Sequence, residues 1–126
     1  MRPPRFLHIG IAFRYLPPPL EQVQALDQAI ASESFDWMRY SYSCYVVWSS
    51  SDTETICRKI LRVSGMKESS SVFICEIDIN SVFAFLQQWA WEWLKKDRGY
   101  GPLVTWTPEP EPPLLTEGLP KPPGTR

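Results

Sequence analysis

The sequence has few of the residues on which enzymes and metal sites usually rely. It contains one histidine, His8, and three cysteines, none of them in a Cys-x-x-Cys or Cys/His metal-binding spacing. A catalytic pair of histidine with cysteine, or of histidine with serine, would have to use His8. We therefore expect no cofactor and no catalytic residue. The cysteines Cys44, Cys57 and Cys75 fall in apolar stretches and are expected to be reduced core residues of an intracellular protein.

Long apolar runs and an excess of charge of one sign are also missing. No apolar stretch approaches the ~20 residues that a membrane-spanning helix needs, and the N-terminus does not read as a signal peptide. The formal net charge of −1 gives no long-range attraction to nucleic-acid phosphates, although a local basic patch remains compatible with it. The 126 residues fit one domain with a tail. We expect a soluble, cytoplasmic protein without membrane contact.

Strand and helix patterns alternate along the first four fifths of the chain. Leu7, Ile9 and Ile11 share one face of a first strand, with His8 and Gly10 on the other face. In the last strand, Phe73, Cys75 and Ile77 read as the buried face. Ser51 and Glu54 form a predicted capping box for the second helix. The predicted elements are strand 6–16, helix 20–32, a strand or hairpin over 38–49, a helix from 51 to 61, strand 72–79 and helix 80–96.

This order predicts an α+β fold, a ferredoxin-like sandwich in which helices cover one face of an antiparallel sheet. Residues 1–99 would form that domain. Residues 100–126 are rich in proline and are expected to form an extended tail, in which Leu103–Thr107 could add a short edge strand.

Four segments resemble a known family, namely Leu20–Ile30, Tyr42–Trp48, Ser51–Leu61 and Val72–Ile77. Over residues 6–80 the chain is similar to the SinR-like proteins and the related small CRISPR-associated adaptation subunits. The resemblance implies a ferredoxin-like fold and a place in a prokaryotic or phage defence-related system. In those subunits an aspartate at the end of the first strand is associated with a divalent metal. The matching stretch here, Phe13–Leu16, has no carboxylate, which implies a scaffold or binding protein rather than a nuclease.

Tryptophans give the strongest indication of a binding surface. Trp89 and Trp93 are four residues apart and share a helix face, whereas Trp91 is expected to point elsewhere. An exposed tryptophan is unfavourable unless it is covered, and the tail with Trp106, or another subunit, could cover it. We therefore predict a partner-binding set of Trp89, Trp91, Trp93 and Trp106. The leading hypothesis is a non-catalytic interaction or scaffold protein that associates with itself or docks onto a larger protein.

Two alternatives stay open. A nucleic-acid-binding regulator would use a basic set on and after the second helix, although a solvated helix face is the simpler interpretation. A metal-dependent nuclease would use Glu76 and Asp78 at the end of the last strand, which can equally be solvent-facing strand-end residues. The basic set is Arg58, Lys59, Arg62 and Lys67.

Overall fold

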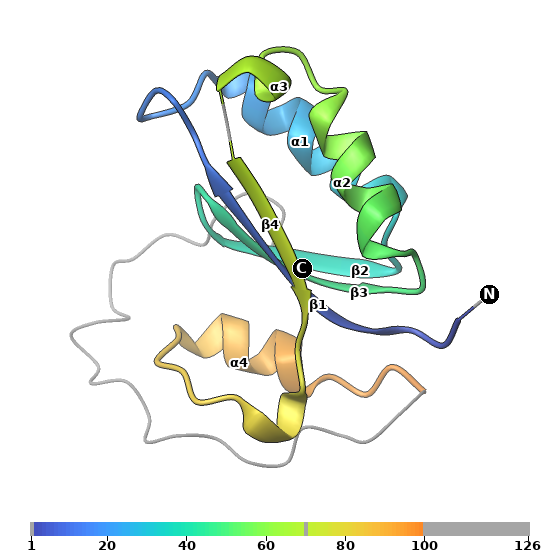
Figure 1. Ribbon diagram of the computed structural model, residues 1–126. Helices are drawn as coiled ribbons and strands as arrows, with labels where there is room; N and C mark the ends of the chain where they lie inside the picture. Colours follow the sequence, from blue (N-terminus) through green and yellow to red (C-terminus); the bar gives the residue numbers. More distant parts are fainter. Residues whose placement is uncertain (1, 70, 100–126) are drawn as a thin grey trace.

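The computed structural model describes residues 2–69 and 71–99, and the predicted tail with its possible edge strand lies outside these residues. The chain forms a sheet with helices above and below it (Figure 1). In order, the elements are β1 (Arg5–Ala12), α1 (Leu20–Ser32), β2 (Asp36–Ser41), β3 (Cys44–Ser49), α2 (Thr53–Leu61), α3 (Met66–Ser69), β4 (Ser71–Glu76), the 3-10 turn η1 (Ile79–Ser81) and α4 (Gln88–Lys95).

The four strands form one antiparallel sheet in the order β2-β3-β1-β4. This confirms the α+β class and the antiparallel sheet, and the strand order is compatible with a ferredoxin-like sandwich. The segment 38–49, left open between one strand and two, is a hairpin of β2 and β3. A bulge between Arg39 and Ser41 interrupts the β2–β3 ladder.

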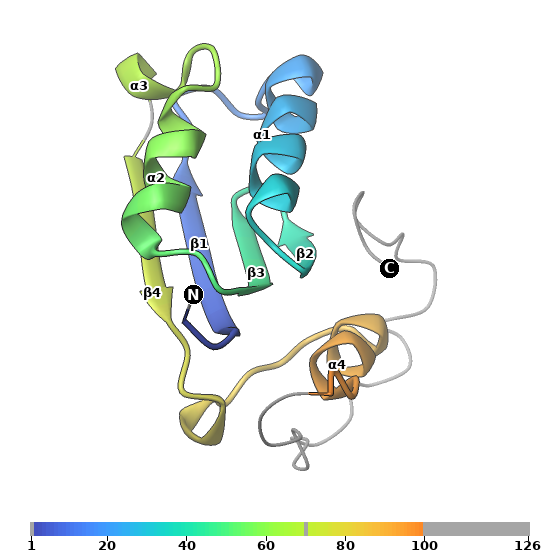
Figure 2. The ribbon, with the colours of Figure 1, turned by 90° about the vertical axis from the view of Figure 1, so that its right-hand side faces the viewer.

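Helices α1 and α2 cover one face of the sheet, as Figure 2 shows. The period of two in β1 sends Leu7, Ile9 and Ile11 toward these helices, where all three are buried. They meet Leu26 and Ile30 of α1 in what we call the first core. Here the predicted faces of β1 and the bounds of α1 are confirmed.

The prediction that helices lie on one face only is wrong, because α4 packs against the opposite face (Figures 1 and 2). Phe6, Met38, Val46 and Trp48 point to that side and contact the tryptophans of α4 in a second core. The sheet is therefore the middle layer of three over its β2–β3 half.

The last helix is also shorter than predicted, since it begins at Gln88 and not at Asn80. Asp78 accepts a hydrogen bond from the Asn80 backbone N–H at 3.0 Å and starts only the short turn η1. From Val82 to Leu86 burial alternates residue by residue, which is the period of an extended chain rather than of a helix. This extended segment carries the chain across the second face of the sheet before α4 begins.

The capping box predicted for α2 does not form. The N-cap residue is Asp52, without a side-chain cap, and Ser51 Oγ instead donates to Glu33 Oε1 at 2.7 Å. Lys59 binds the same carboxylate at 3.1 Å. The hydrogen bonds from Ser51 and Lys59 lower the pKa of Glu33. A contact between distant segments has thus replaced a local one.

The C-terminal end of α4 is fastened to β2. Asp36, which is buried, accepts from Lys96 Nζ at 3.1 Å and lies 3.4 Å from Arg98 Nη2. The Arg98 guanidinium lies 4.3 Å from the ring centre of Trp93 and also over Phe6. Burial acts to raise the pKa of Asp36, but the hydrogen bonds from Lys96, Trp93 and the Trp37 backbone, together with the charge of Lys96, outweigh it, and the pKa is lowered. We call this arrangement the Asp36 clamp.

Within the described part of the chain, no helix has both the length and the apolar composition to cross a membrane.

Candidate functional site

Among the described residues, β4 is an edge of the sheet, because β1 is its single strand neighbour there. In an antiparallel ladder, successive residues direct their backbone groups alternately toward one neighbour and the other. The bond from the Ile77 N–H to the Phe6 carbonyl, at 2.9 Å, sets this alternation. Cys75 and Phe73 therefore bond to β1, and the backbone groups of Val72, Ile74 and Glu76 face outward. We call this outer side of β4 the open edge.

The side chains of the open edge are uncharged until its last residue. Val72 and Ile74 are half-buried against the first core, and Phe73 is 72% exposed on the second face. The prediction that Phe73 and Cys75 form the buried face of this strand is therefore wrong, as is a core position for Cys75. The alternate residues Val72 and Ile74 are the ones that pack under the helices, against the first core.

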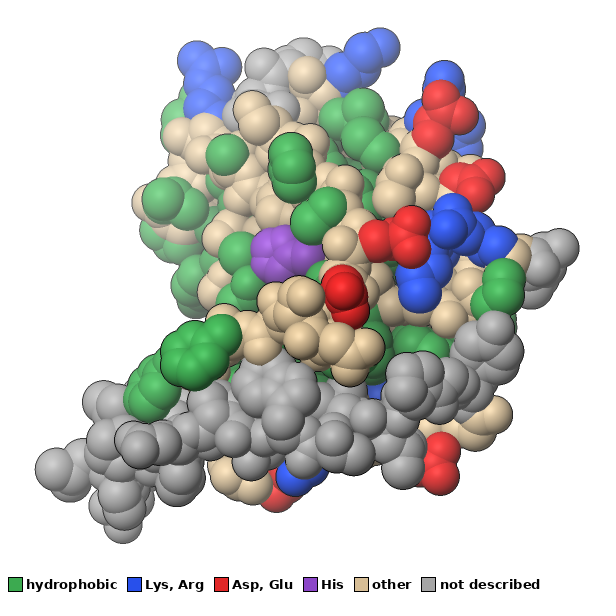
Figure 3. Space-filling view, turned by 60° about the horizontal axis from the view of Figure 1, so that its bottom comes forward, with side chains coloured by type: hydrophobic (Ala, Val, Ile, Leu, Met, Phe, Trp, Pro, Cys, Tyr) green, Lys and Arg blue, Asp and Glu red, His purple; other side chains and the backbone are tan. Residues whose placement is uncertain are grey.

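Over the β1–β4 half of the second face, no helix of the described residues packs on the sheet. Apart from His8, the side chains there are small, apolar or thiol, and α4 packs over the other half of the face. Figure 3 shows hydrophobic side chains gathered around the histidine on this side of the molecule. The residues of this part of the face are His8, Gly10, Ala12, Phe73 and Cys75, with Cys44 of β3 beside Gly10.

His8 makes a specific contact with β2. Its Nε2 lies 2.6 Å from the Tyr40 hydroxyl, with both side chains half-buried. Burial lowers the pKa of His8, so the imidazole is neutral at pH 7. Burial, with a further contribution from Cys44, raises the pKa of Tyr40, which stays protonated. The pair lines a cavity of about 390 Å³ together with Met38 and Phe85.

The three described tryptophans of the predicted partner-binding set are buried. Trp91 is 7% exposed and belongs to the second core with Trp89 and Trp93, so it does not point away from them to solvent. Trp106 lies outside the described residues. A role of these side chains in partner binding stays a prediction.

The predicted basic set is dispersed. Arg58 pairs with Glu54 at 3.4 Å on the helix surface, and Lys59 pairs with Glu33. Arg62 and Lys67 are exposed in and after the turn that follows α2. Two of the four charges thus have acidic partners, which reduces the positive field available to a phosphate chain.

The predicted acidic pair is separated by the end of the strand. Glu76 closes β4 and binds Arg2 at 3.3 Å and Arg5 at 3.7 Å, whereas Asp78 lies beyond it and caps η1. Among the described residues, no group of three or more histidine, cysteine or acidic side chains is placed to hold a metal ion. Glu76 therefore has an observed role as the partner of two arginines.

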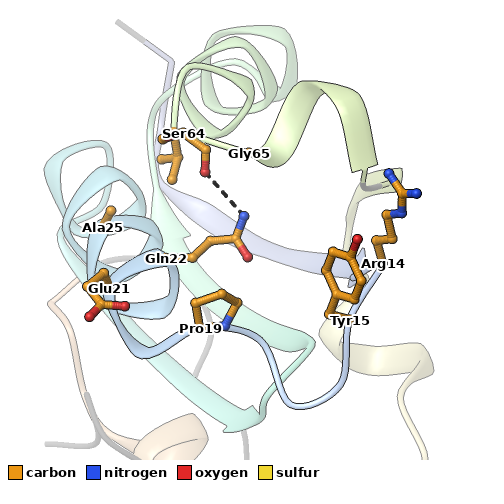
Figure 4. Close-up of a pocket in the computed structure, with 9 residues that line it drawn as sticks. Arg14, Tyr15, Pro19, Glu21, Gln22, Ala25, Ser64 and Gly65 are labelled. Atoms are coloured by element: carbon orange, nitrogen blue, oxygen red, sulfur yellow. Dashed lines mark hydrogen bonds between the residues drawn. The ribbon is translucent and has the colours of Figure 1, made fainter.

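A further cavity, of about 370 Å³, lies between the start of α1 and the turn after α2 (Figure 4). Gln22 crosses it and donates to the Ser64 carbonyl at 3.2 Å. Arg14, the residue in the stretch where the resembled subunits carry their aspartate, lies over the Tyr15 ring at its rim. Glu21 lines the same cavity as Arg14, so the cavity lining carries charges of both signs.

Sequence reasoning considered an unpaired strand edge as an association surface but did not assign it to β4. Its signal was present in residues 71–75, a strand with no charge and no proline, which are the residues that usually protect an exposed edge. It also missed the His8–Tyr40 contact, for which a 32-residue separation leaves no local signal.

The chain matches no protein-family model, no curated protein and no solved structure at a significant level. The resemblance to the SinR-like proteins and adaptation subunits therefore stays a prediction from sequence patterns.

Proposed function

We propose that this protein is a non-catalytic association module that pairs with a second copy of itself through the open edge of β4. The supporting observation is that Val72, Ile74 and Glu76 present outward backbone groups along a regular strand that carries no charge before Glu76. Such an edge pairs readily with another strand.

The pattern of β4 suits antiparallel pairing with its own copy. A two-fold axis near Phe73 or Ile74 would form about four to six backbone hydrogen bonds between the copies. It would also place the exposed Phe73 side chains of both copies on one surface, where they cover each other. The only charge of the strand, Glu76, lies at its end, so the two carboxylates would be on the order of 13–20 Å apart.

The strand order β2-β3-β1-β4 supports this proposal, because it places β4 on the outside of the described sheet. We also propose the finer description of the fold as a ferredoxin-like sandwich, with which this order is compatible. The resemblance of Leu20–Ile30 and Val72–Ile77 supports a scaffold role in a prokaryotic or phage defence-related system. The three free cysteines support a reducing compartment such as the cytoplasm.

The test is the molar mass in solution, measured by light scattering after gel filtration over a wide range of concentration. Phe73→Lys should weaken the dimer by about tenfold or more, because two lysines then face each other across the pairing. Phe83→Lys is the matched control, since Phe83 is also exposed but is not part of β4. An equimolar mixture of Phe73→Lys and Phe73→Glu should restore the dimer.

A wild-type chain that stays monomeric at every concentration would rule out self-pairing. Equal effects of the lysine at 73 and at 83, or no rescue in the mixture, would place any association elsewhere on the molecule.

A further inference from the structure

The cavity beside His8 and Tyr40 is formed by two walls. The sheet supplies His8, Met38 and Tyr40, and the extended segment after β4 supplies Ala84, Phe85 and Leu86. Its volume of about 390 Å³ lies within the range of small-molecule sites. It is separate from the outer side of β4, so this site goes beyond the association proposed above.

The sequence of the extended segment explains why space is left. Its alternation turns Val82, Ala84 and Leu86 toward the sheet, where Ala84 and Leu86 pack on the second core. Alanine at the middle position carries only a methyl group and fills little of the gap. Phe85 contributes to the rim of the cavity, although 58% of its surface is exposed, whereas Phe83 is 88% exposed and does not line it.

The side chains that line the cavity are apolar except for one polar pair, His8 and Tyr40. No Lys, Arg, Asp or Glu is among the described residues that line the cavity. The imidazole of His8 is neutral and the Tyr40 hydroxyl is protonated, as their pKa shifts indicate. They use one hydrogen bond on each other and together keep further capacity to donate or accept. An ionic ligand would lose its hydration here without gaining a counter-charge.

From this complementarity we infer that the cavity binds a small, uncharged, mostly aromatic molecule with a single hydrogen-bonding group, such as a phenol or an aromatic amine. The apolar walls and Phe85 hold the ring system. The His8–Tyr40 pair binds the polar group and fixes its orientation.

The probe for the test is N-phenyl-1-naphthylamine, a neutral fluorophore with two aromatic groups and one N–H. Its fluorescence should rise in a saturable, one-to-one manner on addition of the full chain. Phe85→Ala should weaken binding by about fivefold, the effect of losing one aromatic contact, whereas Phe83→Ala should leave it unchanged. The sulfonated analogue 8-anilino-1-naphthalenesulfonate has the same ring skeleton and should bind about tenfold more weakly, because its charge has no partner.

His8 provides a second readout that does not depend on any substitution. As the only histidine, it gives isolated ring-proton signals by nuclear magnetic resonance, and these should shift as the neutral probe saturates the site. Unmoved His8 signals, equal losses in the two phenylalanine variants, or tighter binding of the sulfonate would each overturn the inference. None of these measurements depends on whether the chain dimerises.

Discussion

The two edges of the sheet differ in how they meet solvent. At β2 the first four residues are all buried, a bulge disturbs the ladder, and the charged side chains of Asp36 and Arg39 turn inward to ion-pair partners. At β4 no residue is fully buried, the register is regular, and no charge appears before Glu76. Natural sheets protect exposed edges with bulges and inward charges. The β2 edge carries that protection, whereas the described residues of β4 lack it.

The charges at the protected edge are organised by long-range contacts. Arg39, only 2% exposed, has its Nε 3.2 Å from Asp27 of α1, and Tyr45 donates to the same carboxylate at 2.6 Å. The Asp36 clamp connects the same strand to the residues after α4. The protection of the β2 edge therefore depends on contacts with α1 and with the residues that follow α4.

The largest expected effect comes from breaking the Asp36 clamp. Asp36→Ala should lower the free energy of unfolding by about 3 kcal/mol, because it leaves the buried Arg98 without its carboxylate partner. Urea unfolding followed by tryptophan fluorescence measures the change. Glu54→Ala removes an exposed ion pair with Arg58 and is the control, with an expected change below about 0.5 kcal/mol. Equal losses in the two variants would contradict a special role of the clamp at the β2 edge.

A smaller effect should distinguish the backbone groups of β4. If the open edge pairs with a second copy, the amides of Val72 and Ile74 should exchange with deuterium on the order of tenfold more slowly at high protein concentration than at low concentration. The amides of Phe73 and Cys75, which bond to β1, should be protected at both concentrations. The exchange is followed residue by residue by nuclear magnetic resonance. In Phe73→Lys the concentration dependence should disappear, and its persistence there would argue against edge pairing.

The smallest effect is a pH dependence confined to the protected edge. The lowered pKa of Asp36 means that its stabilising contribution is present above its ordinary pKa of 3.8. It is lost as the pH falls through the lowered value in the folded state. The difference in unfolding free energy between the wild type and Asp36→Asn should therefore be constant at neutral pH and shrink in acid below about pH 3.8. Urea midpoints of both chains between pH 6 and pH 3 measure it, and a difference that grows in acid would refute the assignment.

Much of the fold could be predicted from local periodicity. The alternation of Leu7, Ile9 and Ile11 identified the buried face of β1, and the stripe of Val23, Leu26 and Ile30 identified α1. Both predictions depended only on neighbours within a few residues. The last strand and last helix were harder, since their patterns were apolar on more than one side. Phe73 and Cys75 were assigned to the core, although the covering layer lies over Val72 and Ile74.

By itself, the sequence determined the order of strands and helices, the absence of a charge excess and the lack of protecting residues in β4, because these follow from composition and local spacing. Only the tertiary structure decided that α4 covers half of the second face, that the tryptophans are buried, and that His8 meets Tyr40 beside a cavity. Those outcomes depend on which segments, distant in the chain, share one face of the sheet. Local patterns carry no information about that pairing.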